Sequence, residues 1–180
     1  MKRLSIGIVA LACTVAPNWL AADVADSSAS GFTVKQTVVI QGTPQDVYAK
    51  IFKIGDWWSS DHTFSQDAHN LSLEAKPGGC FCEKLPAGGG VKHMEVVYVA
   101  PGKSIVLHGT LGPLQTVAAS GAMQIQLSAA DGGTKVDVSY AVSGYQATGM
   151  TSWAAPVDGV LKMQFMRLKS FVEKGDPAAK

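Results

Sequence analysis

Apolar and polar residues alternate along much of the chain, and this period of two is typical of half-buried strands. Residues 33–40 (TVKQTVVI) are rich in β-branched side chains and alternate roughly, so they predict a first strand. Turns that contain Pro and Gly divide the middle of the chain into short segments. These segments predict six more strands, over residues 70–75, 79–84, 91–100, 104–111, 116–129 and 134–143.

Helical spacing of apolar residues replaces this alternation after the first strand. Thr43 and Pro44 are suited to the cap and the first position of a helix, which we expect over residues 44–53. The stretch 55–65 (GDWWSSDHTFS) follows directly and predicts a second short helix or a turn.

A long helix is predicted over residues 156–174, where apolar residues recur at spacings of three and four. Pro156 fits the first turn of this helix, and Gly175 fits its end. One antiparallel sheet and one long helix with an apolar stripe predict an α+β fold. In this fold the curved sheet wraps around the C-terminal helix.

The first 22 residues have the order of a secretory signal peptide. Lys2 and Arg3 precede the apolar run 4–15, and the small pair Ala21–Ala22 follows it. This apolar run is too short for a stable membrane span. We expect cleavage after Ala22, with a second possible site after Ala25, and a periplasmic or secreted protein. Lipidation at Cys13 is an alternative, although the residues before Cys13 match a lipidation signal poorly.

The length and composition favour one globular domain in the rest of the chain. A chain of 180 residues, with 47% apolar and 16% charged residues, is expected to bury a sizeable core. The balance of 15 basic and 14 acidic residues argues against a nucleic-acid partner. We expect a flexible leader over residues 23–31, the domain over residues 32–175 and a short tail over residues 176–180.

Cys80 and Cys82 are the cysteines that remain after removal of the signal peptide. Residues i and i+2 of an extended strand share a face, with Cα atoms about 6.6 Å apart, near the upper limit for a disulfide. The spacing favours two free thiols, and the alternatives are a strained disulfide or part of a metal site. The histidines show no metal-binding spacing, so no metal and no cofactor is predicted.

The predicted element order resembles that of the START-like helix-grip superfamily, also called SRPBCC. The stretches TPQDVYAKI, WW, KPGGCFCE and MEVVYVAPGKSIVLHG are most similar to the branch with the heat-shock-protein ATPase activator domain and polyketide-cyclase-like proteins. The resemblance covers residues 32–174. It implies a cavity between the sheet and the long helix that accepts hydrophobic or amphipathic small molecules, and it supplies no shared catalytic motif.

Aromatic and polar side chains are the candidates for lining such a cavity. Trp57 and Trp58 either pack where the helices meet the sheet or form a pocket wall. In strand 91–100, strict alternation places His93 and Glu95 on one face, but the sequence does not decide which face is inward. The predicted ligand-binding residues are Trp57, Trp58, Phe81, Glu83, Glu95, His108, Tyr140 and Trp153.

Two main functions are compatible with this pattern. The first is binding of a lipid-like or polyketide-like molecule without chemistry. The second is a cyclase or dehydratase type of reaction that uses an acid or base in the pocket. A carboxylate of Asp56 or Asp61 beside His62 could form such a pair, but the sequence favours helix-capping roles for the two aspartates and a surface position for His62. No catalytic residue is predicted, and a co-chaperone role is disfavoured because export separates the protein from ATP.

Overall fold

The structure is a computed structural model, and it describes residues 23–179 of the 180-residue chain. The predicted signal peptide, with its cleavage site and Cys13, lies outside the described residues. Within the described part, none of the helices combines the length and the apolar character needed to cross a membrane.

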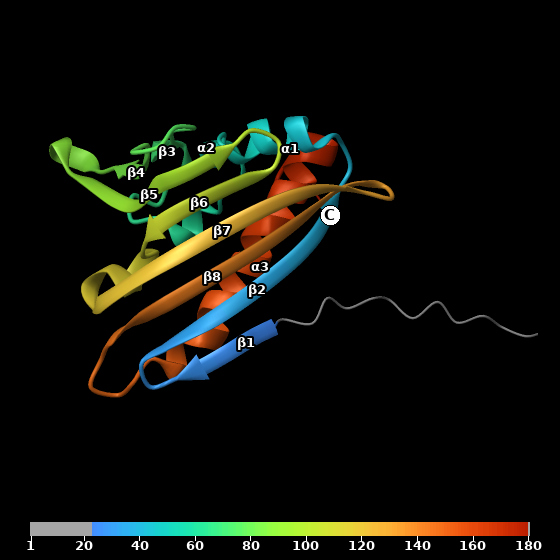
Figure 1. Ribbon diagram of the computed structural model, residues 1–180. Helices are drawn as coiled ribbons and strands as arrows, with labels where there is room; N and C mark the ends of the chain where they lie inside the picture. The colour runs from blue at the N-terminus through green and yellow to red at the C-terminus, as the bar shows by residue number, and fades with distance from the viewer. Residues whose placement is uncertain (1–22, 180) are drawn as a thin grey trace, which may run out of the picture.

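Eight antiparallel strands form one curved sheet, shown in Figure 1. Their order across the sheet is β1-β2-β8-β7-β6-β5-β4-β3, so β1 and β3 are the two edges. The chain passes from β2 to the far edge through two short helices and then returns by successive hairpins. The strands are β1 (Asp23–Ser28), β2 (Gly31–Ile40), β3 (Leu71–Leu73), β4 (Cys80–Lys84), β5 (Gly90–Ala100), β6 (Ser104–Gly109), β7 (Ala118–Ala130) and β8 (Gly133–Tyr145).

Three α-helices and four short 3-10 turns complete the described part of the chain. Thr43 caps the first helix, because its side-chain oxygen accepts a hydrogen bond from the Asp46 backbone N–H at 3.2 Å. Gly175 ends the last helix with a left-handed φ of 75°. The helices and turns are α1 (Pro44–Ile51), α2 (Ile54–Trp57), η1 (Ser60–His62), η2 (Ala68–Asn70), η3 (Pro86–Gly88), η4 (Gly112–Thr116) and α3 (Thr151–Lys174).

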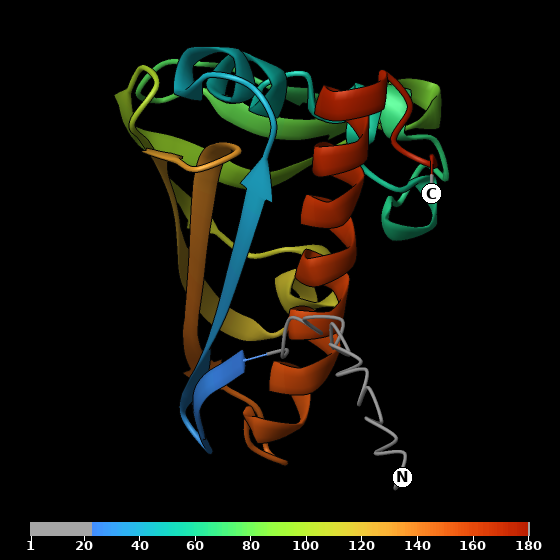
Figure 2. The same ribbon diagram turned by 90° about the vertical axis from the view of Figure 1, so that its right-hand side faces the viewer.

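The long helix α3 runs along one face of the sheet, as Figure 2 shows, and this confirms the predicted fold class. Leu161, Phe165 and Leu168 form its buried stripe, with 1%, 3% and 0% of their surfaces exposed. The buried Asp158 carboxylate accepts a hydrogen bond from the Gln36 amide of β2. Apolar packing and this polar contact therefore hold α3 against the sheet.

The helix begins five residues before the predicted start, at Thr151. Pro156 is consequently its sixth residue and not part of its first turn. The prolyl nitrogen cannot donate to the carbonyl four residues earlier, which is that of Ser152. The helix continues through this position because residues on either side of it pack in the core, with Ala154 3% and Leu161 1% exposed.

Residues 23–28 form a strand, where the sequence predicts a flexible leader. This strand, β1, pairs antiparallel with β2, with Val24 opposite Val34 and Ser28 opposite Gly31. The segment DVADSS has little apolar alternation, so its order comes from the backbone hydrogen bonds that an open sheet edge offers.

The structure joins Cys80 and Cys82 in a disulfide, and the predicted free thiols are therefore wrong. Their Cα atoms are 5.3 Å apart, closer than in a regular strand, where β4 shifts register against β5. Both cysteines are only partly buried, whereas Phe81 and Glu83 between and beside them are buried. The disulfide thus lies on the outer face of β4.

Candidate ligand-binding cavity

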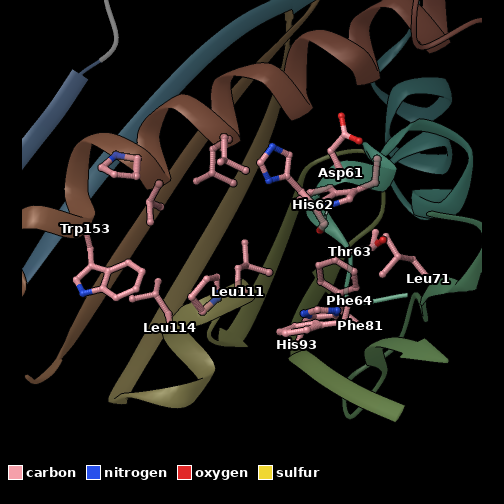
Figure 3. Close-up of a pocket in the computed structure, with 17 residues that line it drawn as sticks. Asp61, His62, Thr63, Phe64, Leu71, Phe81, His93, Leu111, Leu114 and Trp153 are labelled. Atoms are coloured by element: carbon pink, nitrogen blue, oxygen red, sulfur yellow. Dashed lines mark hydrogen bonds between the residues drawn. The ribbon is translucent and has the colours of Figure 1, made fainter. Parts of the chain in front are cut away.

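A cavity of about 450 Å³ opens between α3, the segment after α2 and the η4 turn (Figure 3). Its size lies within the range of about 300–1,000 Å³ that is usual for small-molecule sites. Most of its lining is apolar or aromatic. The lining residues are Trp58, Asp61, His62, Thr63, Phe64, Leu71, Phe81, His93, Leu111, Gly112, Pro113, Leu114, Trp153, Pro156, Val157, Val160 and Leu161.

Aromatic rings form much of the cavity wall. The Trp58 and Phe81 rings pack edge to face, with centroids 5.8 Å apart. The Trp58 indole Nε1 donates to the His62 carbonyl oxygen at 3.1 Å, so it also fixes the short turn η1. Trp153 closes the other end, and its indole donates to the Gln146 side chain. The indole N–H groups of both rings are thereby satisfied within the protein, and both rings line the cavity.

A buried carboxylate and imidazole lie at one end of the cavity. Glu83 and His93 are 2% and 5% exposed, and His93 Nε2 lies 3.0 Å from a carboxylate oxygen of Glu83. His93 lines the cavity, and Glu83 lies behind it. The imidazole stacks on Phe64 and tilts against Phe81, with centroid distances of 5.9 and 5.0 Å.

The Gln115 amide determines which nitrogen of His93 carries the proton. Its nitrogen donates to the carbonyl oxygens of Thr110 and Lys92, at 3.0 and 3.2 Å, which fixes its orientation. The same nitrogen lies 3.3 Å from His93 Nδ1. An amide nitrogen does not accept hydrogen bonds, so Nδ1 cannot donate to it, and the tautomer that fits both contacts has its proton on Nε2 and donates it to Glu83. Nδ1 shares the two amide hydrogens with the carbonyl oxygens of Thr110 and Lys92.

The pKa shifts agree with a neutral histidine beside an ionised glutamate. Burial lowers the pKa of His93, and the Glu83 carboxylate opposes this only in part. Burial alone would raise the pKa of Glu83, but hydrogen bonds from Ser65, the Phe64 backbone and His93 outweigh it and lower that pKa. The pair thus carries one negative charge at neutral pH.

Glu83 also holds the loop that forms the cavity rim. The Ser65 backbone N–H donates to the carboxylate oxygen that His93 does not use. The neighbouring Phe64 is 49% exposed and stacks on His93. At the start of the same loop, the Gln164 side chain of α3 accepts from the Ser59 backbone N–H at 2.9 Å. The loop is therefore fastened at both ends by buried side chains.

A β-bulge points His93 into the cavity. In the pairing of β4 with β5, Phe81 lies opposite Met94 but Cys82 lies opposite Lys92, so His93 is an extra residue. His93 and Met94 are both buried although they are adjacent in a strand. Bulges commonly redirect a side chain in this way next to functional sites. Strict alternation could not have revealed it.

The predicted site residues divide into those near the cavity and those elsewhere. Trp58, Phe81 and Trp153 line it, and Glu83 contacts it through His93. Their role in ligand binding remains a prediction.

Two predicted residues are part of the core and do not line the cavity. Trp57 is 2% exposed, and its indole donates to the carbonyl oxygens of Lys50 and Ile51 at 3.1 and 3.2 Å. Tyr140 is fully buried, with its hydroxyl 3.3 Å from the Gly109 carbonyl oxygen. The polar atoms of both side chains therefore have hydrogen-bond partners within the protein.

Two other predicted residues lie on the outer side of the sheet. Glu95 pairs with Lys92 at the surface, and His108 borders a second, more open groove with Ser120 and Ser143. Neither lines the cavity between sheet and helix, so we do not include them in the proposed site.

The sequence prediction omitted several lining residues. Leu111 and Leu114 form the floor through the η4 turn, where a strand was predicted up to residue 111. Pro113 was the available signal for that turn. Asp61 and His62, which the sequence left open, both line the cavity. Among the described residues, no group of three or more His, Cys, Asp or Glu side chains could hold a metal ion.

Comparisons with known proteins support the fold. No protein-family model matches the chain, and no curated protein matches it. Solved structures do. An uncharacterized protein from Rhizobium leguminosarum is similar at 16% identity and a TM-score of 0.60, over 78% of this chain and 93% of that one. The Aha1 dimer from Colwellia psychrerythraea gives 18% identity and a TM-score of 0.57, over 79% and 97%.

A third similar structure is CalU16 from Micromonospora echinospora. It has 14% identity and a TM-score of 0.52, over 82% of this chain and 76% of that one. Such low identities bear on the fold alone. The chain is thus similar to proteins in which a curved sheet wraps around a C-terminal helix, which is the helix-grip arrangement.

Proposed function

We propose that this chain is an exported SRPBCC-like protein that binds a hydrophobic or amphipathic small molecule, lipid-like or polyketide-like, between the sheet and α3. The observation that carries the proposal is the cavity of about 450 Å³ with its mainly apolar and aromatic lining. A small number of polar groups in such a lining is the usual means of orienting a ligand.

Export is the second part of the proposal. It is supported by the signal-peptide pattern of residues 1–22 and by the Cys80–Cys82 disulfide. Disulfides persist in oxidising compartments and are rare in the cytosol. We therefore place the mature protein in the periplasm or outside the cell.

Binding can be tested with Nile red, an uncharged apolar dye that fluoresces when it leaves water. We expect the dye to bind and to quench tryptophan emission. Trp58→Ala or Trp153→Ala should weaken binding by about 1–3 kcal/mol, the scale of one buried side chain. Tyr98→Ala, which removes an aromatic ring that is 52% exposed, is the matched control and should leave binding unchanged.

A variant that fills the cavity provides an independent check. Val160→Trp adds an indole to the lining, whereas Val39→Trp adds one to an exposed position of β2. The first variant should abolish dye binding and the second should not. Dye binding that survives Val160→Trp in a folded protein would locate the site elsewhere.

A second candidate function is an acid–base enzyme, because Asp61, His62 and His93 all reach the same cavity. The partners of His93 argue against it. A general base needs a nitrogen that faces the substrate, and both nitrogens of His93 are already engaged. Gln115→Ala would free Nδ1, so it should not lower the activity if His93 acts as the base.

A further inference from the structure

The polar side chains of the cavity of the proposed function gather at one end, among the aromatic rings of Phe64 and Phe81, and the other end is apolar. Figure 3 shows Asp61, His62, Phe64 and His93 at one side and Leu111, Leu114 and Trp153 at the other. A ligand that fills it would place a head group near the first set and a hydrocarbon part along the second. The distribution of polar and apolar residues in the lining therefore favours an amphipathic molecule.

The formal charges at the polar end are negative. Asp61 is the carboxylate in the lining, and Glu83 lies directly behind His93. Among the described residues that line the cavity, none is Lys or Arg. Arg167 keeps its positive charge but does not line the cavity, and its guanidinium is directed at the carbonyl oxygens of Trp57 and Trp58.

Hydrogen bonding does not cancel this negative charge. The Gln115 amide nitrogen faces His93 Nδ1, so the imidazole has a proton only on Nε2 and is uncharged. Glu83 accepts bonds from the uncharged imidazole and from the Ser65 backbone. A carboxylate or sulfate on a ligand would meet no Lys or Arg in the lining, and the carboxylates at this end are the exposed Asp61 and the buried Glu83 behind His93.

A cationic head group, unlike an anionic one, would lie near carboxylates of opposite charge. It is attracted by Asp61 and Glu83, and the faces of Trp58 and Phe64 can receive it through cation–π contact. We propose that the ligand of this cavity is a cationic amphiphile, such as an alkylammonium compound, and that anionic lipids such as fatty acids are disfavoured. This inference rests on the proposed binding function and specifies its ligand class.

The test compares two probes that share a dodecyl chain, dodecyltrimethylammonium and dodecanoate, below their micelle concentrations at neutral pH. Binding is followed by tryptophan emission and by calorimetry. We expect the cation to bind at least about tenfold more tightly, because opposite and like charges act on the two probes in a partly buried site. The preference should shrink as salt is added.

Two variants connect this preference with the cavity. Asp61→Asn should reduce the preference several-fold, whereas the matched control Asp131→Asn, in the turn between β7 and β8, should not change it. Val160→Trp should abolish binding of the cation. If the cation still binds this filled variant, it binds the outer surface and the proposal is wrong.

Failure of the proposed charge preference can be distinguished from failure of the proposed binding function. Equal or tighter binding of dodecanoate in the unmodified protein would overturn the charge preference and leave the binding function standing. Failure of both probes and of Nile red would overturn the binding function, and the ligand class with it.

Discussion

Removal of the Glu83 carboxylate should destabilise the protein far more than removal of an exposed carboxylate. Glu83 is 2% exposed and accepts from His93 Nε2 and from the Ser65 backbone N–H. Glu83→Ala leaves both donors without that partner. An unsatisfied buried donor costs about 1–3 kcal/mol, so for two donors we expect a loss of about 2–6 kcal/mol.

The control is Glu95→Ala on the outer face of β5. Glu95 makes a surface ion pair with Lys92, and such pairs contribute about 0–1 kcal/mol. Both variants are measured by urea unfolding, followed by circular dichroism, and compared with the unmodified protein. If Glu83→Ala costs no more than Glu95→Ala, the buried hydrogen bonds do not exist as described.

The pH dependence of the free energy of unfolding should also report on the pair of Glu83 and His93. The pKa of His93 lies below its ordinary value of 6.5, so the unfolded chain takes up this proton first and stability falls as the pH drops below that value. The pKa of Glu83 lies below 4.5, and its contribution is lost as the pH falls further through its folded pKa. His93→Gln should remove the first of these two losses, and an unchanged pH profile would contradict the assignment.

Two more predictions concern the helix and the N-terminus. Leu161→Ala should cost about 2–5 kcal/mol in the same unfolding assay, because Leu161 is 1% exposed in the contact between α3 and the sheet; a loss well under 1 kcal/mol would mean that the helix packs differently. Edman sequencing of exported protein should begin at Asp23 or shortly after it, and a lipid-modified N-terminus at Cys13 would refute the proposed signal cleavage.

The sequence could predict most of the fold because its two periodicities are clear. The apolar stripe through Leu161, Phe165 and Leu168 gave the packing face of α3, and the alternation between β7 and β8 gave their hairpin. It did not reveal β1. Six residues of the type DVADSS have no apolar period, and their pairing depends on an edge that exists only once the sheet has formed.

The cavity was less predictable than the fold. Trp58, Phe81 and Trp153 were candidates because the family resemblance places the segment after the first helix, the strand with Phe81 and the start of the long helix around one cavity, and all three line it. Trp57 looks the same in sequence, yet its indole is satisfied by backbone carbonyl oxygens inside the core. The difference depends on which way two adjacent side chains turn at the end of α2.

The polar chemistry of the cavity depends on one extra residue in β5. In a regular strand, His93 and Glu95 would share a face, and Lys92 would lie on the other. The bulge at His93 changes this arrangement, because it places His93 beside Met94 on the inner face and leaves Lys92 and Glu95 together outside, where they form an ion pair. The same residues without the bulge could present the Glu95 carboxylate together with His93. Backbone geometry at this position, and not residue identity alone, therefore determines that the His93 imidazole faces the cavity while the buried Glu83 carboxylate lies behind it.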